Sequence, residues 1–378
     1  MLALFCCYEG FYRMNIYSNP FTPVFGNEPP ILAGRTQLIN NAKKGLESTP
    51  GDPNRITIFT GPRGSGKTVL LNAISALADE RGWISVHTVA SNQMLDQVIE
   101  QIHRHSSHII DHRSKSKLTA LQIYGMGIQR EIPDERKLTW RAEMDNYLDM
   151  FAEHDVGLLI TIDEVSAAFP EMIEFISTFQ FFIREKRNVA LLMAGLPGNV
   201  IQMFQNPSIS FLRRAFRRAL DPISLPEVRA VIKKTVEISD REIEKEALDI
   251  AAENTKGMPF LIQLIGYHSF NQSNNETITK NDVINGISDA EEDMESMILD
   301  ATINDISDAD KKFLLAMLND QNESRISDIA KRMEVSLSYA GHYKKRLINH
   351  GIISEAGRGK IEFCMPMLKE LLIKRYKA

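Results

Sequence analysis

The feature that most constrains this chain is the segment 61–68, which has the sequence GPRGSGKT. It matches the phosphate-binding pattern G-x-x-x-x-G-K-[ST], in which glycines let successive backbone N–H groups turn toward a polyphosphate. A β-rich run at 55–60 precedes the segment, and a helical run at 69–78 follows it. A helix that begins at the loop also favours an anion through its dipole. The sequence therefore predicts a strand–loop–helix unit that binds phosphate groups.

Residue types within the loop predict separate roles. Lys67 can reach the β- and γ-phosphates, and the Thr68 hydroxyl can hold Mg²⁺. The predicted cofactors are ATP or ADP with Mg²⁺. The predicted nucleotide-binding residues are the loop and the residue after it: Gly61, Pro62, Arg63, Gly64, Ser65, Gly66, Lys67, Thr68 and Val69.

A second motif follows the apolar run 156–162. A continuous apolar run is typical of a strand buried on both faces of a parallel sheet. It ends in Asp163 and Glu164, where open α/β sheets place ligands. We predict that Asp163 holds Mg²⁺ through water and that Glu164 polarises an attacking water. The alternative, an ordinary solvated pair at a strand end, would be preferred without the phosphate-binding loop.

Composition places the chain among soluble globular proteins. Its 378 residues suggest two or three domains, and 43% hydrophobic and 25% charged residues are ordinary values. No apolar run approaches the roughly 18 residues of a membrane span. Three cysteines, Cys6, Cys7 and Cys364, argue against a disulfide framework and favour the cytoplasm. Four clustered histidines lack zinc-ligand spacing and are interpreted as surface residues: His103, His105, His108 and His112.

Two segments are not predicted to be part of a folded domain core. Residues 1–13 are apolar and aromatic but lack the features of a signal peptide, so we expect Met14 to be the physiological start. Residues 107–135 are polar and are predicted to form a mobile insertion.

Between these segments, strands and helices alternate from residue 55 to residue 194, which predicts a parallel sheet covered by helices. Between Pro222 and the C-terminal residues described below, we expect three helices and no strands. They span 225–239, 241–254 and 259–270, and an acidic stretch at 289–310 follows them.

The C-terminal residues differ in charge from the rest of the chain. From Lys311 to Ala378 there are 14 basic and 7 acidic residues, a net charge of +7, against −12 for the remainder. Three predicted helices at 308–318, 326–333 and 337–350, then strands at 351–355 and 361–364, have the order of a winged helix-turn-helix. A basic module on an acidic body suggests an anionic partner.

This order predicts double-stranded DNA as the partner of the module. Residues on the outer face of the third helix would contact bases and phosphates, and residues at the hairpin tip would contact the backbone. The predicted DNA-binding residues are Ser338, Tyr339, His342, Lys345, Arg346, Arg358 and Lys360. A winged helix used only for protein packing is the alternative.

Together, the two nucleotide motifs, the helical segment and the C-terminal module resemble AAA+ ATPases of the initiator clade. Within this resemblance, the chain is most similar to the origin-recognition type and to the STAND-like ATPases. The resemblance covers residues 31–378 and implies these domains: an N-terminal arm (1–30), an α/β P-loop ATPase domain (31–221), a helical lid (222–290), an acidic linker (291–306) and a winged helix-turn-helix (307–378).

The resemblance also assigns further residues. Gly34 and Arg35 resemble a segment that lies near the adenine. Residues 211–218 resemble the segment that supplies an arginine finger to a neighbouring subunit, which implies self-association through the ATP site. Arg213 and Arg214 are the candidate fingers, because a guanidinium stabilises charge on a transferring phosphoryl group. A basic surface segment paired within the acidic body is the alternative.

Two departures from the family pattern favour slow hydrolysis. The segment 189–197 offers no polar sensor unless Asn199 supplies one, and the segment 257–263 lacks the usual lid arginine. The leading hypothesis is a cytoplasmic ATPase whose nucleotide state sets DNA binding or assembly. The second is a STAND-like signalling switch with a protein partner. A small-molecule kinase is a weak third, since no acceptor pocket is evident.

Overall fold

The structure is a computed structural model that describes residues 18–24, 26, 28–111, 140–296, 306–365 and 367–376. The described residues divide into two compact units. The sheet unit contains the described residues of Gly34–Pro222 and Leu299–Ala378, and the helical unit contains those of Met1–Ala33 and Ile223–Ile298. The predicted N-terminal segment 1–13 and Met14 lie outside the described residues.

A parallel five-stranded sheet forms the centre of the sheet unit, in the order β2-β3-β4-β1-β5. Its strands are β1 (Ile56–Thr60), β2 (Ile84–Val89), β3 (Leu158–Asp163), β4 (Val189–Gly195) and β5 (Phe216–Ala219). The register pairs Thr60 with Gly195 and Ile162 with Met193, so the carboxyl ends of β1, β4 and β3 lie at one edge. The predicted parallel sheet is confirmed.

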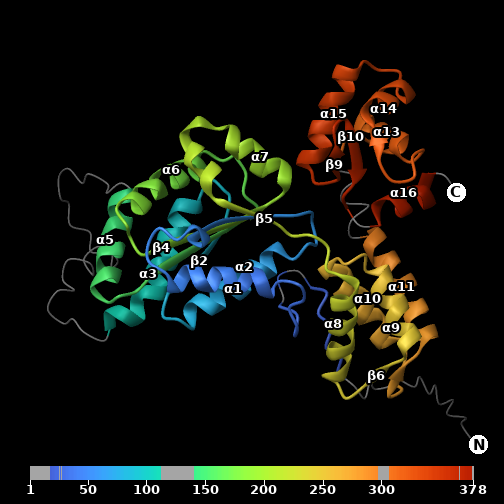
Figure 1. The fold of residues 1–378 in the computed structure, drawn as a ribbon, viewed down its shortest axis with the longest axis horizontal. Helices are drawn as coiled ribbons and strands as arrows, with labels where there is room; N and C mark the ends of the chain where they lie inside the picture. The colour runs from blue at the N-terminus through green and yellow to red at the C-terminus, as the bar shows by residue number, and fades with distance from the viewer. Residues whose placement is uncertain are drawn as a thin grey trace, which may run out of the picture. The chain divides into compact units, whose positions relative to one another are not determined.

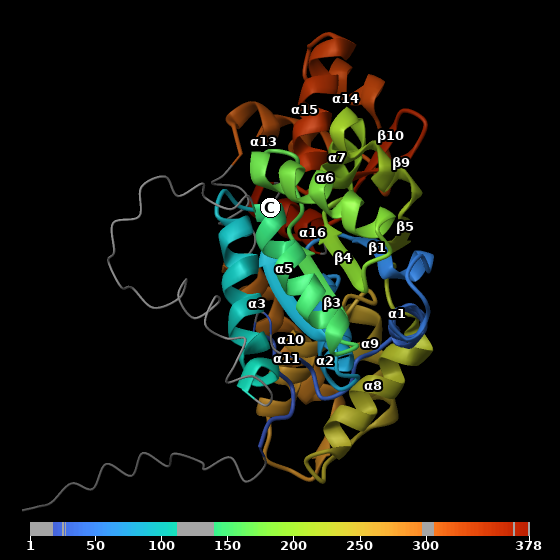
Figure 2. The same ribbon diagram turned by 90° about the vertical axis from the view of Figure 1, so that its left-hand side faces the viewer.

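Helices cover both faces of this sheet because successive strand side chains point to opposite sides. On one face, α1 (Thr36–Glu47) and α2 (Lys67–Asp79) pack on Phe59, Leu159 and Leu192. On the other face, α3 (Met94–Asp111), α5 (Trp140–Glu153) and α6 (Pro170–Arg184) pack on Ile58, Ile160 and Leu191. Figures 1 and 2 show this layering. The short helices η1 (Pro53–Arg55), α7 (Pro197–Gln205) and η2 (Pro207–Arg214) lie in the connections.

The C-terminal part of the sheet unit, residues 306–376, is here called the C-terminal module. Its elements are α13 (Asp308–Met317), β8 (Ser324–Arg325), α14 (Ile326–Arg332), α15 (Leu337–Asn349), β9 (Ile353–Gly357), β10 (Lys360–Phe363) and α16 (Leu368–Tyr376). The strands form an antiparallel sheet in the order β8-β10-β9. The three predicted helices and the predicted hairpin are present. The sequence analysis missed β8 and α16.

In the helical unit, four helices pack together: α8 (Leu225–Glu237), α9 (Lys245–Asn254), α10 (Pro259–Asn271) and α11 (Lys280–Met294). The preceding arm is fixed on α10. Asn19 donates to the backbone oxygen of Tyr267 at 2.9 Å, and the Phe21 side chain is buried against Gly266.

Several sequence-based boundaries were wrong. Strands do not stop after Pro222, since β6 (Glu242–Ile243) pairs in parallel with β7 (Thr277–Ile278). The predicted helix 241–254 therefore begins only at Lys245. Residues 107–111 belong to α3, and residues 291–294 belong to α11 rather than to a linker. The rest of the predicted insertion, 112–135, lies outside the described residues, as do residues 297–305 of the predicted linker. In the part of the chain that is described, no helix is long and apolar enough to span a membrane.

We predict that Gly286→Ala destabilises the helical unit. A Cβ at this position would lie 2.4 Å from the backbone nitrogen of Ser269 in α10. Overpacking costs about 1–3 kcal/mol, which exceeds the roughly 1 kcal/mol that alanine gains over glycine in a helix. Hydrogen exchange of α10 and α11 should become faster. Gly341→Ala in α15 is the control, because a Cβ there meets nothing within 4 Å. Equal protection in both variants would contradict the steric argument.

Candidate nucleotide-binding site

The phosphate-binding loop connects β1 to α2 in the predicted position. Gly66 caps α2 with a φ of +83°, a left-handed conformation that favours glycine. At Gly61 a Cβ would lie 2.5 Å from the Ser65 hydroxyl oxygen, so only glycine fits there. The first backbone N–H groups of α2 have no partner within the helix and point into the loop. The loop is therefore built to bind an anion.

Lys67 is held inside this loop. Its Nζ donates to the backbone oxygens of Gly61 at 3.0 Å and Pro62 at 2.8 Å. The side chain is buried, and this burial lowers its pKa, while the nearby Asp163 and Glu164 carboxylates partly oppose the shift. Because backbone carbonyl oxygens are neutral, they do not cancel the charge of the Lys67 ammonium, which can therefore bind a phosphate.

Asp163 meets the loop directly. Its Oδ2 accepts a hydrogen bond from the Thr68 hydroxyl at 2.5 Å, and its Oδ1 accepts one from the Glu164 backbone nitrogen at 2.8 Å. The two sequence motifs, separated by 95 positions, thus lie side by side at the carboxyl edge of the sheet. This is the arrangement that the sequence predicted.

The Thr68 hydroxyl and the Asp163 carboxylate fit a magnesium ion. Both are hard oxygen donors, and Mg²⁺ commonly takes one or two protein oxygens together with phosphate and water oxygens. Among the described residues, no cluster of three or more histidine, cysteine or acidic side chains could hold a metal alone.

Glu164 has an unusual backbone conformation, with a φ of +53°. Left-handed residues other than glycine are strained and are often found at functional sites. The next residue fixes this turn, because the Val165 nitrogen donates to the Ala194 oxygen at 2.9 Å. The Glu164 side chain is exposed beside the loop. Its carboxylate can therefore reach solvent next to a bound phosphate.

Other predicted site residues support the loop or follow β4. Arg35 is buried, and its guanidinium donates to the backbone oxygens of Ser65 at 3.2 Å and Asp221 at 3.1 Å. It therefore braces the phosphate-binding loop. Gly34, with a φ of +63°, precedes it. Asn199 lies in the first turn of α7, just after β4.

A small cavity of about 280 Å³ adjoins the Thr68–Asp163 pair. Polar side chains from β2, β3 and α3 line it, including Thr88, Thr161 and Gln97. The sequence analysis missed these residues. The signal that could have found them is the rule that ligand sites lie at the carboxyl ends of parallel strands, applied to β2.

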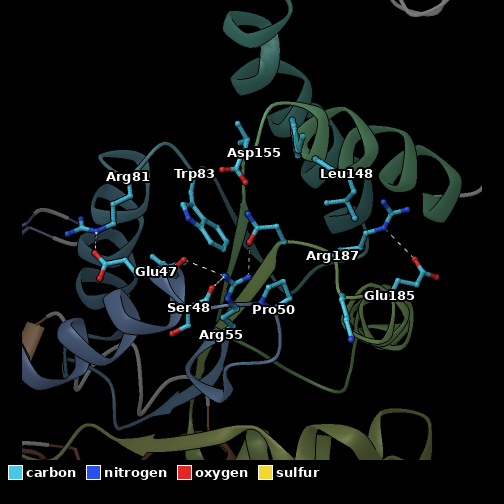
Figure 3. Close-up of a pocket in the computed structure, with 16 residues that line it drawn as sticks. Glu47, Ser48, Pro50, Arg55, Arg81, Trp83, Leu148, Asp155, Glu185 and Arg187 are labelled. Atoms are coloured by element: carbon cyan, nitrogen blue, oxygen red, sulfur yellow. Dashed lines mark hydrogen bonds and ion pairs between the residues drawn. The ribbon is translucent and has the colours of Figure 1, made fainter.

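A larger cavity of about 720 Å³ lies at the opposite edge of the sheet (Figure 3). It is lined by residues that precede the strands, among them Arg55, Trp83 and Asn188. The Arg55 guanidinium donates to the Gly45 oxygen and to Asn188 Oδ1, each at 2.8 Å, and lies over the Trp83 ring. Because its donors are already used within the chain, Arg55 holds loops together. We do not assign a ligand to this cavity.

The C-terminal module contacts the segment that follows β4. Gly351, which ends α15, packs against Leu196, where a Cβ would come within 2.9 Å. Gly198 packs against Ile348 and Asn349 with similar closeness. The Cys364 thiol lies near enough to Lys67 to interact electrostatically, and burial raises its pKa to about 12. The module therefore lies at the edge of the sheet that carries the nucleotide site.

The predicted finger residues differ in their contacts. Arg213 donates from Nε and from a terminal nitrogen to the Phe204 oxygen at 3.1 and 2.9 Å. Arg214 is exposed, and no ion pair is found for it within the described ranges. Both lie in η2, just before the edge strand β5, which the sequence analysis missed.

Most of the predicted DNA-binding residues lie on the surface of the C-terminal module. Ser338, Tyr339, His342 and Lys345 of α15 are exposed, as is Arg358 at the hairpin tip. Two predicted residues are already paired. Arg346 donates to the buried Asp310 at 2.7 Å, and Lys360 donates to Glu323 at 2.6 Å. Arg346 therefore ties α15 to α13.

Two of the predicted surface histidines have polar neighbours within the chain. The Nδ1 atom of His103 lies 3.2 Å from the Tyr147 hydroxyl, and that of His105 lies 2.9 Å from the Ser85 oxygen. His112 lies outside the described residues, and the side chain of His108 is not described.

A parallel sheet with a phosphate-binding loop after β1 and an acidic pair after β3 defines a P-loop nucleotide-binding fold. Residues 51–204 match the family model described as an AAA domain, and residues 296–372 match a domain of unknown function, DUF8462. A search of curated proteins found no significant match.

Two solved structures have the same overall fold. The Walker-type ATPase PABY2304 of Pyrococcus abyssi is similar with a TM-score of 0.66 at 15% identity, over 90% of this chain and 96% of that chain. The ORC2 protein of Aeropyrum pernix, in ADPNP–ADP complexes, is similar with a TM-score of 0.62 at 13% identity, over 93% of this chain and 95% of that chain. At these identities the likeness shows the fold alone.

We predict that Lys67→Ala abolishes tight ATP binding and leaves the protein folded. The ammonium donates to loop carbonyl oxygens, while the core of α2 is formed by other residues such as Leu70 and Ile74. Isothermal titration should show ATP affinity reduced at least tenfold, since a charge-assisted hydrogen bond is worth about 1.5–3 kcal/mol. Unchanged affinity would remove Lys67 from the site.

Proposed function

We propose that this chain is a nucleotide-binding AAA+ ATPase that hydrolyses ATP slowly and whose nucleotide state controls binding to double-stranded DNA. The observation that carries this proposal is the contact between Thr68 in the loop and Asp163 at the end of β3. It brings a phosphate-binding loop, an oxygen pair for Mg²⁺ and the Glu164 carboxylate to one edge. The fold that this chain shares with the Aeropyrum pernix ORC2 protein, solved in ADPNP–ADP complexes, supports ATP and ADP as ligands.

Glu164 is the proposed general base. Its carboxylate is exposed beside the loop, where it can accept a proton from a water aligned on the γ-phosphate. Bound Mg²⁺, held by the Thr68 and Asp163 oxygens, would neutralise charge on the phosphates. Arg214 is the stronger finger candidate, because Arg213 already donates to the Phe204 carbonyl. A finger acting on another subunit's nucleotide requires self-association.

The slow rate is proposed because the turn after β4 presents Leu196 and Pro197, which carry no charged group for the γ-phosphate. Removing one such donor from an active site typically costs about 10²–10³ in rate.

The C-terminal module is the proposed DNA-binding part, and we interpret it as a winged helix-turn-helix. Its α14, tight turn and α15 precede a β9–β10 hairpin. The exposed residues at the amino end of α15 would contact base edges, while Lys345 and Arg358 would contact phosphates. Arg346 is not part of this proposal, because its guanidinium is committed to Asp310.

The nucleotide site and the module are linked through β4. This strand pairs with both β1 and β3, and the turn after it contacts the module through Leu196 and Gly198. A shift of this turn on nucleotide binding would move α15. The same contact favours the second candidate, a STAND-like switch in which the module packs on the ATPase and a protein partner receives the output.

We predict that Glu164→Gln keeps ATP binding and loses hydrolysis. The amide preserves shape but cannot accept the proton, and general-base catalysis contributes about 10²–10⁴ in rate. Steady-state phosphate release should fall by at least about 10² while the ATP affinity stays within a factor of about two. Wild-type turnover in this variant would assign the base to another residue.

We predict that Lys345→Ala weakens binding to all duplex sequences alike and flattens the dependence on salt by about one unit of slope, as expected for one lost phosphate contact. Lys344→Ala is the matched control. Its ammonium already donates to Glu355 at 2.6 Å, whereas Lys345 is exposed. Fluorescence anisotropy of the full chain over a salt series measures both. Absence of duplex binding in every nucleotide state would favour the STAND-like switch.

A further inference from the structure

Four arginines lie within six residues in and just before β5, the outermost strand of the central sheet. Arg213 and Arg214 end η2, and Arg217 and Arg218 belong to β5. No carboxylate lies within ion-pair distance of these guanidinium groups in the described ranges, although the chain outside residues 311–378 is acidic. Their positive charge is therefore available to an anion from outside the chain.

Aromatic side chains and a carbonyl hold three of these cations in place. Phe204, near the end of α7, receives two of them: its backbone oxygen accepts from Arg213, and its ring lies 4.9 Å from the Arg217 guanidinium carbon. Arg218 lies 4.7 Å from the Phe216 ring centre. Cation–π contacts orient a guanidinium without neutralising its charge. The Arg213 and Arg217 charges, both held at Phe204, repel each other, and an anion bound between them would offset this repulsion.

The backbone of β5 adds donors at the same place. The strand is last in the sheet order and pairs with β1 along one side. Its other side therefore presents backbone N–H groups that no neighbouring strand of this sheet uses. Arginine guanidinium groups and backbone N–H groups are the usual donors to phosphate oxygens of nucleic acids.

We propose that Arg213 and Arg217, here called the arginine cluster, bind the phosphate backbone of double-stranded DNA. The cluster is a second DNA contact, separate from the C-terminal module, and it rests on the proposed function. Arg213 and Arg217 meet at Phe204 beside the unpaired side of β5, and two adjacent cations suit the successive phosphates of a polyanion. Arg218, the next residue of the strand, points to the opposite face of the sheet. The contact reads no sequence, because phosphates carry none.

The test compares the full-length wild-type protein with Arg217→Gln and with the Arg213→Gln, Arg217→Gln double variant. Each lost phosphate contact should lower affinity for a mixed-sequence duplex several-fold and reduce the salt slope by about one unit. Arg217→Lys should keep most of the slope, since it retains the charge. ATP affinity from isothermal titration should not change.

Arg141→Gln is the matched control. This arginine also lies over a phenylalanine, 4.3 Å from the Phe181 ring centre, but it is paired with Glu185 at 2.8 Å. Its removal should leave DNA affinity unchanged.

Wild-type affinity and slope in both cluster variants, with Lys345→Ala still weakened, would overturn the cluster alone. Absence of duplex binding by the wild type would overturn the proposed function as well. Unchanged DNA binding with lost hydrolysis in the cluster variants would overturn the DNA role and assign the cluster to a neighbouring subunit's nucleotide.

Discussion

The hydrogen bond between the Thr68 hydroxyl and the Asp163 carboxylate depends on the register of the strands in the central sheet. It forms only because β1, β4 and β3 are parallel and in a register that ends them at one edge. Each strand is buried by helices on both faces, so a slip by one residue would reverse every buried side chain. The hydrophobic core therefore sets the geometry of the site.

The same register gives β4 a second role. It lies between the strand that carries the loop and the strand that carries the acidic pair, and its following turn touches the C-terminal module. Glycines at 198 and 351 make this close approach possible, since a Cβ at each would lie within 3.0 Å of an atom across the contact. A chain with such close contacts can transmit a small shift at the phosphates to α15, because packed interfaces move as units rather than deform continuously.

The sequence predicted the parallel sheet and the meeting of the two nucleotide motifs, because buried strands and phosphate loops have strong local patterns. It missed β5, whose four residues include two adjacent arginines and lack an apolar run. It missed β6, β7 and β8, which have two residues each and form only through tertiary contacts. It could not foresee that Arg346 binds Asp310 or that Arg213 binds the Phe204 carbonyl, because partners more than a helical turn apart leave no periodic signal.

The central claim is that nucleotide state controls DNA binding. The most direct measurement is the affinity of the full-length protein for a duplex, at one fixed salt concentration, without nucleotide, with ADP and with a non-hydrolysable ATP analogue. The account predicts affinities that differ several-fold between these states in the wild type and do not differ in the Lys67→Ala variant. Equal duplex affinity of the wild-type protein in all three states would contradict it.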